Sequence, residues 1–257
     1  MKVKQSVLEV LSAAVCRGKE LELTGQLDRK LYLDTNNVLE ACGGKWNRKA
    51  KAHVFGEEAQ PLIDTVIVTG EVRTHREDGW FPTPPDLADR LAVAAQIDSR
   101  MRVLEPSAGE GSLVAAIRRV AAHARIVAIE LNERRFMRLA AVGQNVGNIV
   151  MLPRDFMDDA DMPAEGLGLF DRVVMNPPFA KGQDVDHVTK ALSRLLPGGL
   201  LVAIMSASAM FRTDRRYTGF RELVARNQGF IEPLPDGSFV SSGTSVNTVM
   251  VTMRRSV

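Results

Sequence analysis

From residue 101 onward, short apolar runs alternate with stretches whose apolar residues recur every three or four positions. The short runs predict strands, and the periodic stretches predict helices. Strands are expected at 101–106, 125–131, 148–155, 170–176, 200–210, 230–235 and 246–255. Helices are expected at 112–122, 132–145 (with Asn132 as its cap), 184–196 and around 220–228. Such alternation is typical of a doubly wound α/β fold, in which helices cover both faces of a mostly parallel sheet.

Residues 1–75 do not follow this alternation. They contain two helical stretches, 6–18 and 36–44, and one β-rich run at 64–72. We therefore interpret them as a small N-terminal module, joined through a charged, proline-rich linker at 72–85 to a main domain spanning 76–257.

Composition narrows the class only slightly. The formal net charge of +2 marks no overall field for nucleic acid, so any basic surface must be local. Cys16 and Cys42 lack the spacing of a zinc site or a disulfide framework, and no apolar stretch approaches the length of a membrane span. A cytoplasmic protein without a metal is expected, and its oligomeric state stays open.

The stretch VLEPSAGEGSL follows the first strand of the main domain and opens a helix. A glycine-rich turn at this point can bring backbone amides close to a nucleotide-like ligand. The spacing does not match the dinucleotide fingerprint, since Val114 stands where the third glycine would be. Glu130, at the end of the second strand, lies at the distance along the chain that recognition of ribose hydroxyls requires. A purely structural turn and a solvated strand-end carboxylate remain the alternatives.

Two further side chains follow the third strand. Asp155 offers an acceptor at the same sheet edge, and Phe156 offers a ring face. The alternative is a loop acid beside a core phenylalanine, because only the order along the sheet supports a binding role.

The fourth strand ends in NPPF, residues 176–179. Consecutive prolines fix the backbone and leave carbonyl acceptors in a preset direction. Asn176 adds a side-chain carbonyl, and Phe179 adds a face for a planar group. Two acceptors and a ring suit an exocyclic amine on a flat heterocycle or amide. Hydrogen bonds from that amine to Asn176 and to the Pro177 carbonyl would expose the nitrogen lone pair for attack on an electrophile.

In this order, EPSAGEG, the acid of VAIEL, RDF and VVMNPPF resemble the class I S-adenosylmethionine-dependent methyltransferases that modify amines. The upstream FPTPPDLADRLA is similar to the segment that precedes the glycine loop in DNA adenine methyltransferases. The resemblance covers about residues 80–254 and implies a seven-stranded, Rossmann-like sheet with an antiparallel last strand. It implies a target amine at Asn176, Pro177, Pro178 and Phe179. It also implies a cofactor site formed by Phe81, Thr83, Glu105, Ser107, Gly109, Gly111, Glu130, Asp155, Phe156 and Asn176.

Within this cofactor site, the resemblance gives Thr83 and Gly109 to the methionine moiety, Glu130 to the ribose, and Asp155 and Phe156 to the adenine. Ser107 departs from the family pattern, because many members have a glycine there.

Adenine N6, cytosine N4, guanine N2 in RNA and a protein glutamine all offer an amine of this kind, and NPPF alone does not separate them. The FPTPP segment favours adenine N6 in DNA as the target. Cytosine C5 is excluded, because that chemistry needs a cysteine nucleophile and neither cysteine follows the glycine loop. An RNA methyltransferase (guanine N2 or adenine N6) and a catalytically idle nucleic-acid-binding protein remain the alternatives.

A base inside duplex DNA must be flipped out to reach such a pocket, so phosphate contacts are also needed. Two basic stretches can supply them. One lies in the N-terminal module and includes Lys45, Arg48, Lys49 and Lys51 around Trp46. The other follows the fifth strand and includes Arg212, Arg215 and Arg216. Because the main domain lacks a long insertion, we expect the N-terminal module to contribute to DNA recognition.

Overall fold

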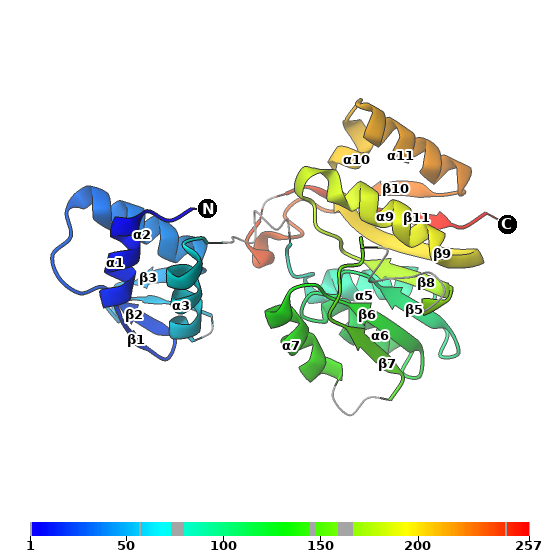
Figure 1. Ribbon diagram of the computed structural model, residues 1–257. Coiled ribbons are helices and arrows are strands. Elements are labelled where there is room, and N and C mark those ends of the chain that lie inside the picture. The colour runs from blue at the N-terminus through cyan, green and yellow to red at the C-terminus, as the bar shows by residue number, and fades with distance from the viewer. Residues whose placement is uncertain are drawn as a thin grey trace. The chain divides into compact units, whose positions relative to one another are not determined.

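The computed structural model describes residues 2–56, 58–72, 80–143, 147–158, 167–244 and 246–256. The chain divides into two compact units, Met1–Asp78 and Gly79–Val257 (Figure 1). The domain boundary expected after residue 75 and half of the linker expected at 72–85 lie outside the described residues.

The larger unit contains a seven-stranded sheet in the order β10-β11-β9-β8-β5-β6-β7. Strands β5 to β9 pair in parallel, whereas β11 runs antiparallel to both of its neighbours. The strands are β5 (Arg102–Glu105), β6 (Arg125–Ile129), β7 (Ile149–Leu152), β8 (Phe170–Met175), β9 (Leu195–Ser206), β10 (Phe230–Pro233) and β11 (Thr248–Arg254). The doubly wound, mostly parallel fold expected from the sequence is confirmed.

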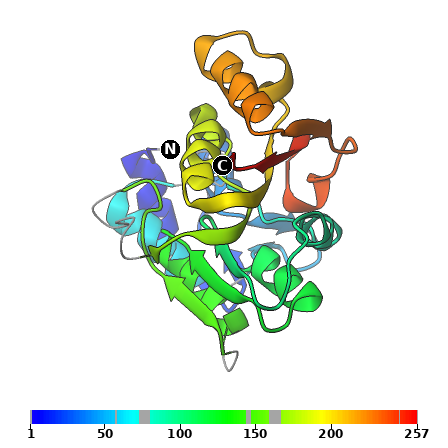
Figure 2. The same ribbon diagram turned by 90° about the vertical axis from the view of Figure 1, so that its right-hand side faces the viewer.

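Alternate residues of each strand enter two separate hydrophobic cores, because successive side chains point to opposite faces. Val103 packs with the helices on one face, and Leu104 packs with those on the other. Figure 2 shows helices on both sides of this sheet. One face is covered by α5 (Pro85–Ala94), α6 (Ser112–Val120) and α7 (Glu133–Gly143), and the other by α9 (Gln183–Ser193) and α11 (Arg215–Arg226).

The order of the strands reverses between β5 and β8. From β5 the chain builds outward through β6 and β7, then returns to place β8 on the other side of β5. Loops after these two neighbouring parallel strands meet at one edge of the sheet, which is where open α/β sheets bind ligands. The glycine-rich loop follows β5, and NPPF follows β8.

Two sequence predictions in this unit were wrong in detail. The strand expected at 200–210 spans Leu195–Ser206 and is followed by a short helix, α10 (Ser208–Phe211). The preceding helix ends at Ser193 rather than at residue 196. Leu195 already pairs with Phe170, and the register then shifts before Leu200 pairs with Arg172. A local irregularity of this kind accommodates the Pro-Gly-Gly residues 197–199 within a strand.

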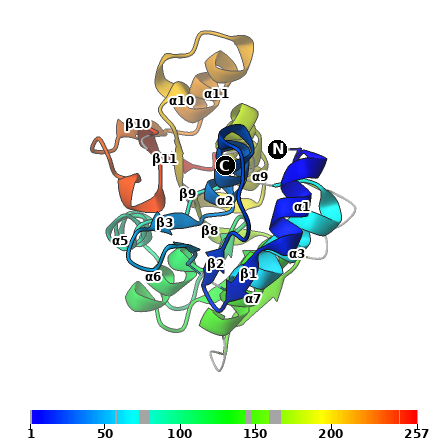
Figure 3. The same cartoon turned by 90° about the vertical axis from the view of Figure 1, so that its left-hand side faces the viewer.

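The N-terminal unit has its own core, to which the described helices α1, α2 and α3 and a four-stranded antiparallel sheet in the order β1-β2-β4-β3 contribute. In Figure 3, α1 lies beside α3, and the two helices are in contact. Its elements are α1 (Gln5–Ala13), β1 (Val15–Arg17), β2 (Glu20–Glu22), α2 (Arg29–Ala41), β3 (Lys45–Asn47), β4 (Ala52–Val54) and α3 (Ala59–Thr69).

The β-rich run expected at 64–72 is largely helical, so that prediction was wrong. Ala59, Ile63 and Val66 recur at helical spacing and are buried in the core of this unit. Burial of this stripe outweighs the weak strand preference of β-branched residues. Within the described residues, no helix has both the length and the apolar character needed to span a bilayer.

Candidate active site

The loop between β5 and α6 requires glycine at two positions. Gly109 has a φ of +56° and Gly111 a φ of +93°, a region that other residues rarely adopt. Gly111 is the N-cap of α6, and the Ala108 amide donates a 2.8 Å hydrogen bond to the Ile129 carbonyl. The loop is thereby fixed to the end of β6.

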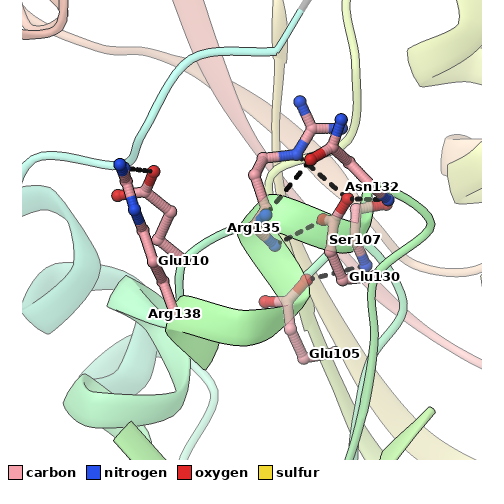
Figure 4. A network of polar contacts seen from close by, with 8 residues as sticks. Glu105, Ser107, Glu110, Glu130, Asn132, Arg135 and Arg138 are labelled. Carbon is pink, nitrogen blue, oxygen red and sulfur yellow. Dashed lines mark hydrogen bonds and ion pairs between the residues drawn. The ribbon is translucent and has the colours of Figure 1, made fainter. Parts of the chain in front are cut away.

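Glu130 follows β6 and holds the loop in place. One carboxylate oxygen accepts a 2.8 Å hydrogen bond from the Gly109 amide. The other accepts hydrogen bonds from the Asn132 amide at 2.7 Å and from Arg135 Nε at 3.0 Å. Asn132 also caps α7 as predicted, because its side-chain oxygen accepts from the Arg135 amide. Figure 4 shows this network, in which Glu130 is only 5% exposed.

Trp80 and Arg135 lie against the glycine loop near Gly109. The Arg135 guanidinium lies 4.8 Å from the centre of the Trp80 ring. A side-chain carbon added at Gly109 would lie only 2.7 Å from Trp80 Nε1, so the indole packs directly against this glycine. A second ion pair, between Arg138 and Glu110, spans the outer side of the loop (Figure 4). The sequence analysis missed Trp80 and Arg135, although one adjoins FPTPP and the other follows Glu130 by five residues.

Glu105 ends β5 and is fully buried. One of its oxygens accepts a 3.1 Å hydrogen bond from the Ser107 amide, while the other has no hydrogen-bond partner among the described residues. Burial raises the pKa of Glu105 well above its usual range, the Ser107 hydrogen bond opposes this shift, and the charge of Glu130 adds to it. The neutral acid form of Glu105 is therefore favoured.

His187, on α9, contacts the loop from the other face of the sheet. Its Nδ1 lies 3.3 Å from the Ser107 hydroxyl. Burial lowers the pKa of His187 to about 4, with smaller opposing effects from Asp155 and Asp186. The imidazole is therefore neutral at physiological pH. His187 was not among the expected site residues.

Asp155 and Phe156 lie beside His187 rather than in the cleft described below. The Phe156 ring is 2% exposed and belongs to the hydrophobic core, 6.0 Å from the imidazole. The Asp155 carboxylate accepts a 2.8 Å hydrogen bond from the Met157 amide. A role for the pair toward a cofactor adenine stays a prediction.

Asn176 is buried at the end of β8, and its amide is held in one orientation. Nδ2 donates to the Phe81 carbonyl and to the Thr83 hydroxyl, both at 3.0 Å. A carbonyl can only accept, so the NH2 group must face Phe81 and the amide oxygen must point the other way. That oxygen, Oδ1, is buried without a hydrogen-bond partner among the described residues.

The rest of NPPF forms an aromatic corner. Pro177 is buried, whereas Pro178 and Phe179 are partly exposed. The Phe179 ring stacks on Phe81 at 6.2 Å between centroids and meets the Phe239 ring edge-on at 6.0 Å. Phe239 was not among the expected site residues.

These elements enclose a narrow cleft next to the glycine loop. Its lining includes five residues expected from the sequence, namely Phe81, Thr83, Ser107, Gly109 and Asn176. Its cavity volume is only about 10 Å³, far below the roughly 300–1,000 Å³ of typical small-molecule pockets, so the cleft is closed to a ligand in this conformation. Trp80 also lines the cleft, so movement of its indole would widen it.

The second predicted basic stretch adjoins NPPF. Arg216 donates a 2.7 Å hydrogen bond to the carbonyl of Lys181, just beyond Phe179, and forms an ion pair with Asp186. Arg212 pairs with Asp214, and Arg215 is exposed. The other predicted cations, Lys45, Arg48, Lys49 and Lys51, belong to the N-terminal unit and are exposed there. Across the described parts of the chain, no group of three or more His, Cys, Asp or Glu is arranged to hold a metal ion.

The fold is that of the class I methyltransferases. A modification subunit of a putative type I restriction enzyme from Vibrio vulnificus is 15% identical, with a TM-score of 0.58 over 76% of this chain and 48% of that one. The type I restriction enzyme EcoKI M protein is 15% identical, with a TM-score of 0.56 over 99% of this chain and 58% of that one. A putative class I S-adenosylmethionine-dependent methyltransferase from Listeria monocytogenes is also 15% identical, with a TM-score of 0.54, covering 77% and 67% of the two chains.

Membership of a family is shown by the amino-acid sequence. The profile of the family "Methyltransferase small domain" matches residues 85–231, more than half of the chain, and the protein belongs to this family. A comparison with curated proteins gave no match. The chain spans about half the length of the Vibrio subunit, so similarity to that subunit describes only this part of it.

S-adenosylmethionine is the cofactor of this class, and the residues of the loop are compatible with it. Gly109 and Gly111 give the loop its positive φ angles, and the Gly109 amide bonds to Glu130. Movement of the Trp80 indole away from Gly109 would let a ligand approach that part of the backbone. The buried oxygen of Asn176 that lacks a partner among the described residues leaves an acceptor position near the same loop. Three hydrogen bonds from its own chain already occupy the Glu130 carboxylate, which leaves one of its roughly four acceptor positions, on the oxygen that accepts from Gly109, for a ligand.

Proposed function

We propose that the protein methylates an exocyclic amine on a nucleobase, specifically N6 of adenine in duplex DNA. The observation that carries this proposal is the orientation of the Asn176 amide. Its NH2 group is occupied by Phe81 and Thr83, and its oxygen is buried without a donor beside the glycine loop. Because a buried acceptor without a partner is costly, this oxygen is suited to a donor supplied by a ligand.

An amine N–H would supply that donor. Asn176 Oδ1 accepts one hydrogen bond from the amine, and the Pro177 carbonyl accepts the second in the direction fixed by the two prolines. Two such bonds draw the nitrogen out of conjugation with the ring and expose its lone pair. When bound, S-adenosylmethionine supplies an electrophilic methyl group. The chain itself contributes orientation and exclusion of water, which are large terms when the reacting atoms are held in line.

Phe179 would bind the face of the base. It is partly exposed, while Phe81 and Phe239 fix the tilt of its ring. Stacking of a base on an aromatic ring is worth roughly 1–3 kcal/mol, which offsets part of the few kcal/mol that base flipping costs. The basic residues near Lys181, next to the same corner, favour a substrate with phosphates.

The choice of adenine in DNA over an RNA base rests on the FPTPP segment, which is in contact with Asn176 through Phe81 and Thr83. An RNA methyltransferase and a catalytically idle nucleic-acid-binding protein are the alternatives. Incubation of the purified protein with radiolabelled S-adenosylmethionine and equal amounts of duplex DNA and structured RNA distinguishes all three. Label in RNA alone supports the first alternative, and label in neither supports the second.

The decisive variant is Asn176→Ala. It removes the acceptor for the amine, so modified adenine should disappear from genomic DNA after expression in a methylation-free host. Calorimetry should show that the cofactor still binds. Asn227→Ala is the matched control, because Asn227 is also a buried, hydrogen-bonded amide but belongs to the C-terminal end of α11. An active Asn176→Ala enzyme would contradict the role proposed for this residue.

A further inference from the structure

The N-terminal unit carries a short β-hairpin, formed by β3 and β4. Lys45 pairs with Val54 and Asn47 with Ala52, which leaves residues 48–51 as the turn. The Asn47 side chain accepts hydrogen bonds from the Lys49 amide at 2.8 Å and the Ala50 amide at 3.1 Å. Lys51 completes the turn with a φ of +53°. These contacts make the tip a defined structure.

The hairpin concentrates positive charge. Residues 1–78 contain twelve Lys and Arg and twelve Asp and Glu, yet residues 41–56 contain four of the cations and none of the acids. Those four, Lys45, Arg48, Lys49 and Lys51, are exposed, and none forms an ion pair with the described residues. The unit is therefore neutral as a whole but strongly polarised, with its positive end on the hairpin. Four unpaired cations on one small element form an electrostatic footprint for phosphates.

Trp46 lies among these cations and is 46% exposed. Its ring meets the fully buried His53 ring of the neighbouring strand edge-on, with 5.2 Å between centroids. His53 Nε2 lies 2.8 Å from Asn36 Oδ1, and Asn36 Nδ2 donates at 2.9 Å to the Glu40 carboxylate. Since the Asn36 NH2 group faces Glu40, its oxygen accepts the proton of His53 Nε2. This chain fixes the imidazole, and the imidazole supports the exposed indole.

We propose that the β3–β4 hairpin is a two-stranded ribbon that enters the major groove of duplex DNA, with its four cations on the phosphates and Trp46 against the sugars or base edges. This inference rests on the proposed function only in taking DNA as the substrate. The major groove of B-DNA, about 12 Å wide, admits a two-stranded ribbon, whereas the deep, narrow major groove of A-form RNA does not. The ribbon would give the enzyme a hold on DNA that is separate from its catalytic cleft.

The test measures binding of a fluorescein-labelled DNA duplex to the full-length protein by anisotropy at several salt concentrations. The Arg48→Gln/Lys49→Gln double variant should bind more weakly. The slope of log K against log[salt] should become shallower by about 1.8, since each phosphate contact contributes about 0.9. Arg29→Gln/Lys30→Gln is the matched control, because it removes the same charge from the start of α2 in the same unit. The control should retain the wild-type slope.

Trp46 provides a second readout. In a Trp80→Phe background it is the remaining tryptophan, and DNA should change its fluorescence. Trp46→Ala should weaken binding without changing the salt slope. The inference fails if both double variants lose affinity equally, if the hairpin variants bind like wild type, or if an RNA duplex of the same sequence gives the same dependence on the hairpin. DNA binding through the hairpin without any methyl transfer would retain this inference and refute the proposed function instead.

Discussion

Thr83 offers the sharpest test of how the cleft holds its catalytic amide. Its hydroxyl accepts one of the two hydrogen bonds of Asn176 Nδ2, and both residues are less than a tenth exposed. Thr83→Val keeps the shape of the side chain but removes the acceptor. The second bond, to the Phe81 carbonyl, still prevents a full flip, because the flipped amide would set oxygen against oxygen.

The expected loss of activity follows from the Asn176 N–H group that Thr83→Val leaves without an acceptor. A buried donor without a partner costs about 1–3 kcal/mol. If the amide escapes this cost by leaving its productive orientation, the rate of methyl transfer falls by roughly 5- to 150-fold. In the proposed function the amide holds the target amine, so kcat should fall while the KM for S-adenosylmethionine changes little. Thr83→Ser restores the hydroxyl and should recover most of the activity.

Steady-state kinetics with varied cofactor and saturating DNA separate this role from the one implied by family resemblance, in which Thr83 contacts the methionine moiety. In that case the KM for S-adenosylmethionine would rise and kcat would change less. Full activity of Thr83→Val, or equal impairment of Thr83→Ser, would refute the argument that this hydroxyl orients Asn176.

Three more expectations concern the glycine loop and two buried residues of α9, Asp184 and His187. Gly109→Ala should weaken cofactor binding in calorimetry, because the residue has a φ of +56° and the added carbon would lie 2.7 Å from Trp80 Nε1; unchanged affinity would show that the loop adapts. Cofactor binding should change Trp80 fluorescence in a Trp46→Phe background, and a silent titration would mean that the indole stays against Gly109. Burial raises the pKa of Asp184 to about 6 and lowers that of His187 to about 4. Folded Asp184 holds its proton more tightly than the unfolded chain, so it makes stability fall as pH rises from 3.8 to about 6. Folded His187 makes stability rise from about 4 to 6.5. Urea unfolding at pH 4.5 and 6 should therefore give Asp184→Asn a more positive change with pH than wild type and His187→Gln a more negative one; identical changes would contradict these assignments.

The sheet of the larger unit was predictable because its central strands are buried on both faces. Apolar runs such as residues 173–175 of β8 and 200–205 of β9 leave little ambiguity, and the helices between the strands have clear periodicity. The N-terminal unit was less predictable. Its strands are only three residues long, and α3 is rich in β-branched residues whose burial becomes evident only in the folded unit.

Some residues of the candidate site could likewise be predicted from the sequence, and others could not. Gly109, Thr83 and Asn176 meet in one cleft, as the order of the motifs along the chain implied. Trp80 and Arg135 were missed because their role depends on a contact across the loop that no local pattern records. The orientation of the Asn176 amide was equally inaccessible, since its two acceptors lie more than ninety residues away in sequence.

The reversal of strand order between β5 and β8 makes the spacing of the two motif loops independent of the chain that connects them. Direct backbone pairing of Val103 with Arg172 and of Leu104 with Val173 sets that spacing. An insertion after α7 or β7 would lengthen the path between the loops without altering this pairing. New segments can therefore be added to that half of the sheet, by evolution or by engineering, while the catalytic geometry is preserved.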